Sequence, residues 1–269
     1  MERKPQWAID RDRARKAGPE PVWLFGLHAV RDALANPARR HHRLVLTKNA
    51  ADRLQDVLGS DRPDGVPEPE MADPRRFPVP LDPGSVHQGA ALLVDPLDWG
   101  GLDPLCVPDQ GQPPLVVLLD RVTDPHNVGA ILRSAEVFGA RAVIAPRRHA
   151  APETGALAKA ASGALERQPY IRVQNLSRAM RALADMGYLL IGLDGQGEDT
   201  LVAALADVGT RPIALVLGAE GPGLRQKTTE MCDRLVRIDP AGAFGSLNVS
   251  NAAAVSLFAA SENVKKLCE

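Results

Sequence analysis

Three polar segments of the chain have the residue types that bind and act on a small ligand. Residues 217–224 leave a run of branched apolar residues and enter a glycine-rich turn with one carboxylate, Glu220. Residues 246–252 form a polar elbow before a run of small residues, and residues 120–139 carry Asn127 and Arg133. We expect the first two segments to be loops that close on one ligand and the third to supply polar groups. This combination favours an enzyme over a scaffold.

The glycine-rich turn does not match the common phosphate-binding loops. A Walker loop would end in Gly-Lys-Ser/Thr, and a dinucleotide fingerprint would have the order Gly-x-Gly-x-x-Gly. Residues 218–224 have neither pattern. The remaining interpretation is a turn whose glycines let the backbone approach a flat or charged ligand. Glu220 would then lie in the pocket or hold a neighbouring loop. A plain strand-to-helix turn is the alternative.

Asn127 and Arg133 are interpreted together because both follow the first core strand. Asn127 is a good N-cap for the helix that follows it. The six-residue spacing is predicted to place Arg133 on the same side, and ligands of open α/β sheets bind beyond the carboxyl ends of the strands. The alternative is a cap and an exposed arginine. Asn248 and Ser250 likewise could serve only as caps of the last helix.

The composition describes an ordinary globular protein of 269 residues, with 45% hydrophobic and 24% charged residues. No apolar stretch approaches the roughly 20 residues that a membrane span requires. The three cysteines, Cys106, Cys232 and Cys268, are widely spaced and odd in number. They predict neither a disulfide framework nor a metal site, and they indicate a reducing cytoplasm.

Local basic clusters keep nucleic acid among the candidate partners although the net charge is only −1. One cluster is Arg39, Arg40 and Arg43 with the two histidines between them, and another is residues 147–149, Arg-Arg-His. Each cluster is equally well interpreted as solvated surface. Local charge, not net charge, decides polyanion binding.

Apolar runs alternate with helical patterns and predict two α/β domains. Residues 1–20 are expected to be a flexible basic arm, residues 21–95 a small α/β domain, and residues 96–113 a proline-rich linker. Residues 114–269 contain runs such as 115–119 and 213–217, which are typical of strands buried on both faces of a parallel sheet. Strands that alternate with helices of this length predict a doubly wound sheet.

The three polar segments resemble the signature motifs of the SpoU family of RNA ribose 2′-O-methyltransferases, in the knotted SPOUT superfamily. The resemblance covers residues 115–264 and rests on Asn127-Val128-Gly129 with Arg133, on residues 217–224, and on Ile238 with residues 246–254. The N-terminal part, from residues 25–30 to residues 87–89, resembles the small α/β, ribosomal-protein-L30e-like RNA-binding domain of bacterial members. That two-domain form is similar to the enzyme that methylates a guanosine in the peptidyl-transferase P-loop of 23S ribosomal RNA.

The resemblance implies a deep trefoil knot at the C-terminus, an obligate homodimer, S-adenosylmethionine as cofactor, and no metal. It implies cofactor contacts at Leu217, Gly218, Gly221, Ile238, Leu247 and Asn248. It implies a catalytic polar site of Asn127, Arg133, Glu220, Ser246 and Asn248. RNA is expected to dock on the N-terminal domain, with Arg39, Arg40 and Arg43 contacting phosphates.

Arg133 is not expected to be the base, because an arginine stays protonated in proteins. We favour a clamp on an RNA phosphate that also stabilises the developing alkoxide, with the proton taken by that phosphate, by a water or by Glu220. One departure stands out: the family usually continues Ile-Pro-Met where this chain has Ile238-Asp239-Pro240. A transfer-RNA methyltransferase and a catalytically inactive RNA-binding protein of this fold remain the alternatives.

Overall fold

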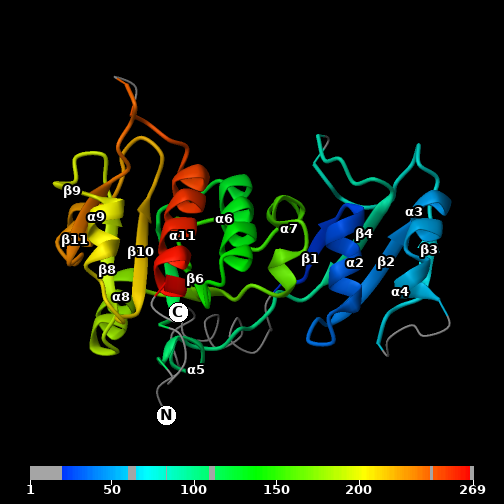
Figure 1. Cartoon of the computed structure of the whole chain (residues 1–269). Coiled ribbons are helices and arrows are strands. Elements are labelled where there is room, and N and C mark those ends of the chain that lie inside the picture. Colours follow the sequence, from blue (N-terminus) through cyan, green and yellow to red (C-terminus); the bar gives the residue numbers. More distant parts are fainter. Residues whose placement is uncertain (1–19, 60–64, 83, 109–112, 243–244, 267–269) are drawn as a thin grey trace, which may run out of the picture. The chain divides into compact units, whose positions relative to one another are not determined.

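The computed structural model describes residues 20–59, 65–82, 84–108, 113–242 and 245–266. The chain divides into two compact units, residues 1–97 and 98–269 (Figure 1). The predicted basic arm, residues 1–20, lies outside the described residues except for its last one. Among the described residues no helix is both long and apolar enough to span a bilayer.

The first unit is a small α/β layer. Its described strands are β1 (Val22–Phe25), β2 (His41–Leu46), β3 (Pro69–Met71) and β4 (Ala90–Val94), in the sheet order β1-β4-β2-β3. Its described helices are α2 (Leu27–Ala35), α3 (Lys48–Arg53) and α4 (Gln55–Leu58). β4 pairs antiparallel with β1 and β2, and the apolar side chains of α2 and the sheet are buried together.

The second unit contains a sheet whose pairings, among the described residues, are all parallel, in the order β7-β6-β5-β10-β8-β11-β9. The strands are β5 (Leu115–Asp120), β6 (Ala142–Pro146), β7 (Tyr170–Val173), β8 (Leu189–Leu193), β9 (Asp199–Thr200), β10 (Ile213–Gly218) and β11 (Arg234–Arg237). The helices are α5 (Asp103–Cys106), α6 (Pro125–Val137), α7 (Gly155–Ala161), α8 (Leu176–Asp185), α9 (Leu201–Ala206), α10 (Gln226–Thr229) and α11 (Val249–Lys266), with a 3₁₀ turn at Ala164–Glu166.

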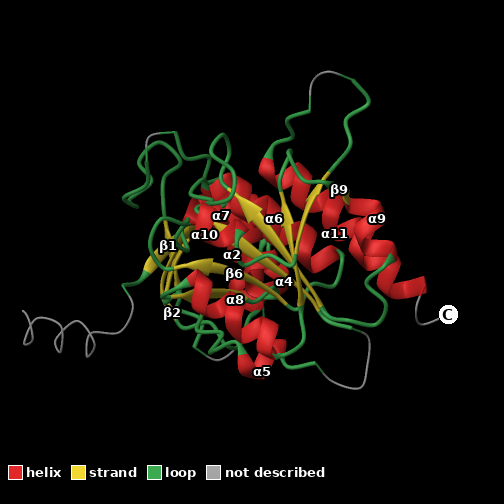
Figure 2. Ribbon diagram, turned by 90° about the vertical axis from the view of Figure 1, so that its left-hand side faces the viewer, coloured by secondary structure: helices red, strands yellow, loops and turns green. Residues whose placement is uncertain are grey.

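The central strands are apolar on both faces because helices cover both faces (Figure 2). In β5, Val116 and Leu118 join the core cluster beneath α8, and all six residues of the strand are buried. Since side chains alternate along a strand, Leu115, Val117 and Leu119 face the opposite layer, where α11 packs on α6 and β10. The predicted α/β fold with a parallel sheet is confirmed.

The start of α6 differs from the prediction. Asp124, not Asn127, is the N-cap: its side chain accepts a hydrogen bond from the His126 amide, and Pro125 occupies the first turn. Proline suits that position because its missing N–H has no partner there in any helix. Asn127 therefore lies inside the helix and is buried, which leaves its amide for tertiary contacts.

The other differences between the sequence-based expectations and the structure concern short strands and an interrupted helix. Residues 61–83 are rich in proline and charge, which favours loop, but β3 lies within them and pairs parallel with β2. The apolar spacing of residues 50–58 favours one helix, but the structure has two short helices separated by Leu54. β9 and β11 were not predicted, because strands of two to four residues have too short a pattern to be distinguished from loop.

The two described cysteines are expected to be unreactive in the native protein. Burial raises the pKa of the Cys106 thiol to about 11 and that of Cys232 to about 12. The thiolate is the reactive form, so at pH 8 a Cys268→Ser variant should react with Ellman's reagent only after unfolding. Because the folded pKa values are raised above about 8.5, stability should fall as the pH rises from about 9 toward 11. Rapid labelling of the native variant at pH 8 would contradict this expectation.

Candidate active site

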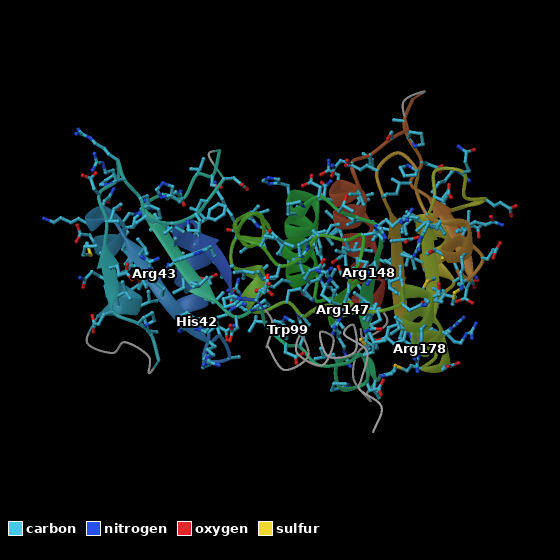
Figure 3. All side chains as sticks on the ribbon, turned by 180° about the vertical axis from the view of Figure 1, so that it is seen from behind. His42, Arg43, Trp99, Arg147, Arg148 and Arg178 are labelled. Carbon is cyan, nitrogen blue, oxygen red and sulfur yellow. The ribbon has the colours of Figure 1, made fainter. Side chains whose placement is uncertain are left out.

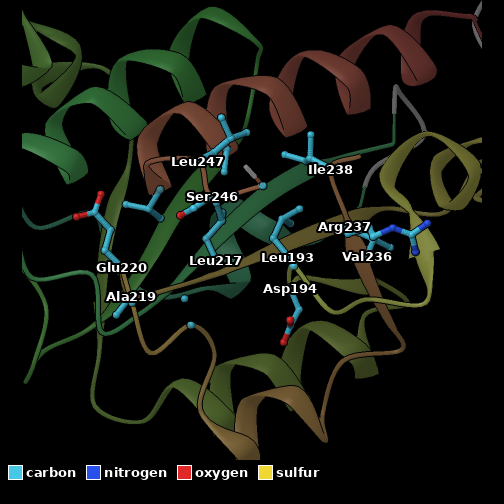
Figure 4. Close-up of a pocket in the computed structure, with 17 residues that line it drawn as sticks. Leu193, Asp194, Leu217, Ala219, Glu220, Val236, Arg237, Ile238, Ser246 and Leu247 are labelled. Atoms are coloured by element: carbon cyan, nitrogen blue, oxygen red, sulfur yellow. The ribbon is translucent and has the colours of Figure 1, made fainter. Parts of the chain in front are cut away.

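A cavity of about 310 Å³ opens at the carboxyl ends of β8, β10 and β11 (Figure 4). Three segments of the second unit line it, residues 193–195, 217–223 and 236–252 in part. Leu217, Leu247 and Ile238 supply apolar wall, while Glu220 and Arg237 lie at opposite ends in this view. The sequence-predicted residues that line it are Leu217, Gly218, Glu220, Gly221, Ile238, Ser246 and Leu247.

The glycine-rich turn after β10 is a tight backbone loop. Ala219 and Gly223 exchange backbone hydrogen bonds of 3.2 and 3.0 Å, which closes the loop on itself. Gly221 and Gly223 have φ values of 82° and 67°, a region that side chains disfavour. A Cβ on Gly218 would lie 2.2 Å from the carbonyl carbon of Gly223, so only glycine fits there. Residues 218–221 and Gly223 of this loop form that wall of the cavity.

Asp120 anchors this loop to the end of β5. The residue is fully buried, and its carboxylate accepts hydrogen bonds from the Arg225 amide at 3.1 Å, from Arg225 Nε at 2.7 Å and from the Thr228 hydroxyl at 2.6 Å. Three donors compensate the cost of burying the charge. The loop that walls the cavity is thus tied at both ends, by β10 and by Asp120.

Asn127, Glu220 and Asn248 form one hydrogen-bonded cluster, although they are far apart in the sequence. Asn127 Nδ2 donates to Glu220 Oε1 at 3.3 Å, and Asn248 Nδ2 donates to Asn127 Oδ1 at 3.0 Å and also to Glu220 Oε1. Two amide donors on one carboxylate oxygen orient the carboxylate and leave Oε2 without a hydrogen bond to any described residue. Within the described chain, Glu220 therefore has one oxygen available for a ligand or a water.

Asn248 caps the start of α11, as the alternative interpretation predicted, and it also belongs to the cluster with Asn127 and Glu220. Its Oδ1 accepts from the Ser250 amide at 2.8 Å at the start of α11, while its Nδ2 points to Glu220. An amide side chain can do both because it has an acceptor and a donor end. Capping and function are not exclusive here.

Arg133 does not join this cluster. Its side chain is exposed, and it makes no hydrogen bond or ion pair with the described residues. The expectation that it lies on the same side as Asn127 was wrong, because six residues are about 600° of helix, which leaves the two side chains about 120° apart. Arg133 faces outward, where it is accessible to a large partner.

The unusual acidic residue beside the cavity is neutralised by its neighbour. Arg237 Nε binds Asp239 Oδ1 at 2.8 Å, and Arg237 Nη1 donates to the Gly197 and Glu198 carbonyls at 2.8 and 2.6 Å. Arg237 lines the cavity and Asp239 does not. The departure from the family pattern therefore adds an ion pair at the rim rather than a bare charge in the pocket.

The three arginines of the first unit differ in accessibility. Arg39 is only 4% exposed and donates to the Asp95 carbonyl at 2.9 Å, so its burial corrects the expectation that it contacts phosphate. Arg40 is exposed and lies 3.9 Å from the Asp95 carboxylate. Arg43 on β2 forms a bidentate pair with Glu70 and lies over the Trp23 ring (Figure 3). That pair raises the pKa of Arg43 and lowers the pKa of Glu70.

Sequence reasoning missed the anchor of the site. Asp120, Arg225 and Thr228 were not predicted to be site residues, nor were residues 193–195. A signal was present for Asp120, which is the one charged residue at the end of an otherwise apolar strand. In the described parts of the chain, no group of His, Cys, Asp and Glu is arranged to hold a metal ion.

Comparisons with known proteins agree on one family. The model of the SpoU rRNA Methylase family matches residues 114–258. The 23S rRNA (guanosine-2'-O-)-methyltransferase RlmB of Vibrio cholerae is 41% identical over 88% of this chain and 95% of its own. RlmB of Ralstonia nicotianae is 43% identical over 88% of this chain and 94% of its own. The SpoU methyltransferase AviRb of Streptomyces viridochromogenes, in complex with the cofactor AdoMet, superposes with a TM-score of 0.73 at 25% identity, over 94% of this chain and 92% of that one.

Proposed function

Because the chain belongs to the SpoU rRNA methylase family, we propose that it transfers a methyl group from S-adenosylmethionine to a guanosine ribose 2′-hydroxyl of 23S ribosomal RNA. The observation that carries this proposal is the cluster of Asn127, Glu220 and Asn248 at the rim of the glycine-walled cavity. The target is a guanosine of the peptidyl-transferase P-loop, and the reaction takes place in the cytoplasm.

The cavity suits S-adenosylmethionine in size and lining. Its volume of about 310 Å³ is at the lower end of the ~300–1,000 Å³ typical of small-molecule sites. Apolar side chains for a flat base lie beside exposed backbone from residues 218–221. We assign the cofactor contacts to Leu217, Gly218, Gly221, Ile238 and Leu247. We assign Asn248 an indirect role at the cofactor site, because it reaches the cavity through its hydrogen bond to Glu220, which lines the cavity.

The bound cofactor supplies an electrophilic methyl on a sulfonium. In the transfer, the ribose oxygen forms the new bond to the methyl carbon, the carbon–sulfur bond breaks with its electron pair going to sulfur, and the hydroxyl proton leaves. The protein's contribution is to hold the 2′-oxygen in line at about 3 Å and to receive the proton. Asn127 and Asn248 orient Glu220 so that Oε2 receives that proton, directly or through a water.

The remaining polar residues position the RNA. Ser246, on the cavity wall, is assigned a hydrogen bond to the reacting nucleotide. Arg133, exposed on α6, is assigned a clamp on an RNA phosphate beside the alkoxide that develops at the 2′-oxygen. A planar guanidinium with several donors suits that bidentate task.

The N-terminal unit is proposed to be the RNA-docking domain. Its four described strands with α2, α3 and α4 support assignment to the ribosomal-protein-L30e-like type. Arg40 and Arg43 are the phosphate-contacting residues of this surface, and Arg39 holds the backbone instead. We assign the linker to the methyltransferase domain, residues 114–269, to residues 96–113, of which α5 packs within the second unit and Cys106 is fully buried in its core.

A C-terminal knot and a homodimer complete the proposal. After β11 the chain returns past β8 and β10 to place α11 against α6, which supports threading of the final helix through a loop. Val137 on α6 and Val255 and Phe258 on α11 are large apolar residues exposed by 45–69%. Such a patch is costly in water, so we assign it to contact with a second copy.

Mapping of 2′-O-methyl sites in RNA, with and without the gene, tests the proposal. Loss of methylation at a P-loop guanosine of 23S rRNA is the expected result. Loss of a methylation site in transfer RNA instead would identify transfer RNA as the substrate. An unchanged map would overturn the enzymatic assignment. Isothermal titration with S-adenosylmethionine distinguishes the inactive RNA-binding protein, which would give no heat of binding.

The variant Glu220→Gln should lower kcat by roughly 10²-fold, the lower range for a positioned proton acceptor. Glutamine keeps the oxygen that accepts from Asn127 and Asn248, so the melting temperature and the affinity for S-adenosylmethionine should change little. Single-turnover methylation of a P-loop transcript is the measurement. An unchanged rate would rule out proton transfer to Glu220.

A further inference from the structure

A second, strongly basic cavity lies in the methyltransferase unit, at the carboxyl ends of β5, β6 and β7. Its volume is about 220 Å³, and none of the described residues that line it is acidic. Its lining residues are Arg121, Pro146, Arg148, His149, Gln174, Asn175, Leu176, Ser177, Arg225 and Lys227. It shares no residue with the first cavity, and the function proposed above does not use it.

Three of its cations carry uncompensated charge. Arg121, Arg148 and Lys227 are exposed, and none of them makes an ion pair with a described residue. The fourth, Arg225, is held by the buried Asp120, which partly offsets its charge. The cavity therefore has a net positive charge, which attracts anions and repels cations.

The rim of the cavity is a rigidly held loop rather than a chance cluster. The Arg172 guanidinium donates to the carbonyls of Pro146, Arg147, Ala150 and Ala151, at 2.7 to 3.4 Å. The Arg147 side chain in turn donates to the Arg172 carbonyl at 3.1 Å. Figure 3 labels Arg147 and Arg148 on this loop. These bonds hold residues 146–151, so Arg148 and His149 project from a fixed backbone.

Two further features of the backbone favour anion binding. Residues 175–177 are the N-terminus of α8, a helix of 10 residues whose amide groups and dipole favour negative charge. Arg121 and His149 have φ values of 64° and 60°, in the left-handed region that side chains rarely adopt. Both of these strained residues line the cavity. Strain of this kind persists where the surrounding structure imposes it, often at binding sites.

We propose that this cavity binds the phosphodiester backbone of the RNA substrate, next to the methyl-transfer site. The inference rests on the proposed function, which supplies a polyanion as substrate. The loop after β10 joins the two cavities: residues 218–223 wall the first, and Arg225 and Lys227 line the second. A phosphate held at Arg148 and Lys227 thus fixes the RNA relative to the loop that binds the cofactor.

The test compares Arg148→Glu and Lys227→Glu with Arg211→Glu, an exposed arginine at the amino end of β10, the opposite edge of the sheet. Each lining variant should weaken binding of a P-loop hairpin transcript by roughly tenfold and lower the slope of log affinity against log salt by about 0.7–1. KM for RNA should rise while single-turnover kcat at saturating RNA changes less than twofold. Arg211→Glu should behave as the wild type.

The possible outcomes distinguish failure of the cavity proposal from failure of the proposed function. If the wild type methylates the transcript and the lining variants keep its affinity and salt slope, the cavity does not bind RNA. If the lining variants lose binding of inorganic phosphate but keep the wild-type affinity for RNA, the cavity takes a free anion and the backbone assignment is overturned. Absence of methylation by the wild type would instead count against the proposed function. Titration with S-adenosylmethionine should give the same affinity for all three variants, which excludes misfolding.

Discussion

Replacing Gly218 by alanine should strongly reduce methyl transfer. The added Cβ would lie 2.2 Å from the Gly223 carbonyl carbon, 2.4 Å from its oxygen and 2.4 Å from the Leu224 amide nitrogen. All three atoms are backbone, so the loop must open to relieve the overlap. An overlap of this kind costs about 3 kcal/mol or more, which corresponds to roughly 10²-fold in affinity. Isothermal titration with S-adenosylmethionine should show that loss, with the methylation rate at subsaturating cofactor reduced to a similar extent.

Gly242→Ala provides the matched control for Gly218→Ala. The substitution is the same, but a Cβ at Gly242 meets no atom within 4 Å, and that residue does not line the cavity. Its affinity and its melting temperature should equal those of the wild type. Near-normal cofactor binding by Gly218→Ala would mean that the loop after β10 does not form the cofactor wall.

Removing the buried carboxylate of Asp120 should cause the largest loss of stability. Asp120→Ala leaves the Thr228 hydroxyl, at a residue that is 1% exposed, and the Arg225 amide without their acceptor. Each unsatisfied group costs about 1–3 kcal/mol, so the total for the two is roughly 2–6 kcal/mol. The Arg225 side chain is 44% exposed and can be hydrated, so it adds little. For a domain of this size the melting temperature should fall by roughly 4–24 °C.

Separate substitutions of Thr228 and Arg225, which donate to Asp120, test whether the Asp120 carboxylate itself anchors the loop. Thr228→Val removes one buried donor and should lower stability by about 1 kcal/mol, while Arg225→Ala should lower it less. Asp120→Ala should also weaken S-adenosylmethionine binding at temperatures where it is folded, because the loop loses its tie to β5. A thermal shift for Asp120→Ala no larger than that of Thr228→Val would show that the carboxylate is not the anchor.

Some interpretations failed where side-chain direction mattered. A cap at Asn127 was the alternative interpretation of that residue, yet Asp124 caps the helix, because a suitable residue three positions earlier precedes a proline. Arg133 was predicted to share a side with Asn127, and the helical rotation places it elsewhere. Arg39 was grouped with Arg40 and Arg43, but its guanidinium turns inward to a carbonyl. Residue types alone do not specify these directions.

By itself the sequence determined the alternation of strands and helices, the parallel sheet and the family, because those depend on local apolar periodicity and on short motifs. The glycine-rich turn and the polar elbow were recognisable for the same reason. Only the tertiary structure decided which side chains meet: Asn127, Glu220 and Asn248 join across 93 and 121 residues of chain. It also showed that Asp120 holds the loop and that Arg148 and His149 line a second cavity. Contacts between distant segments depend on how the strands are ordered in the sheet, and no local pattern encodes that order.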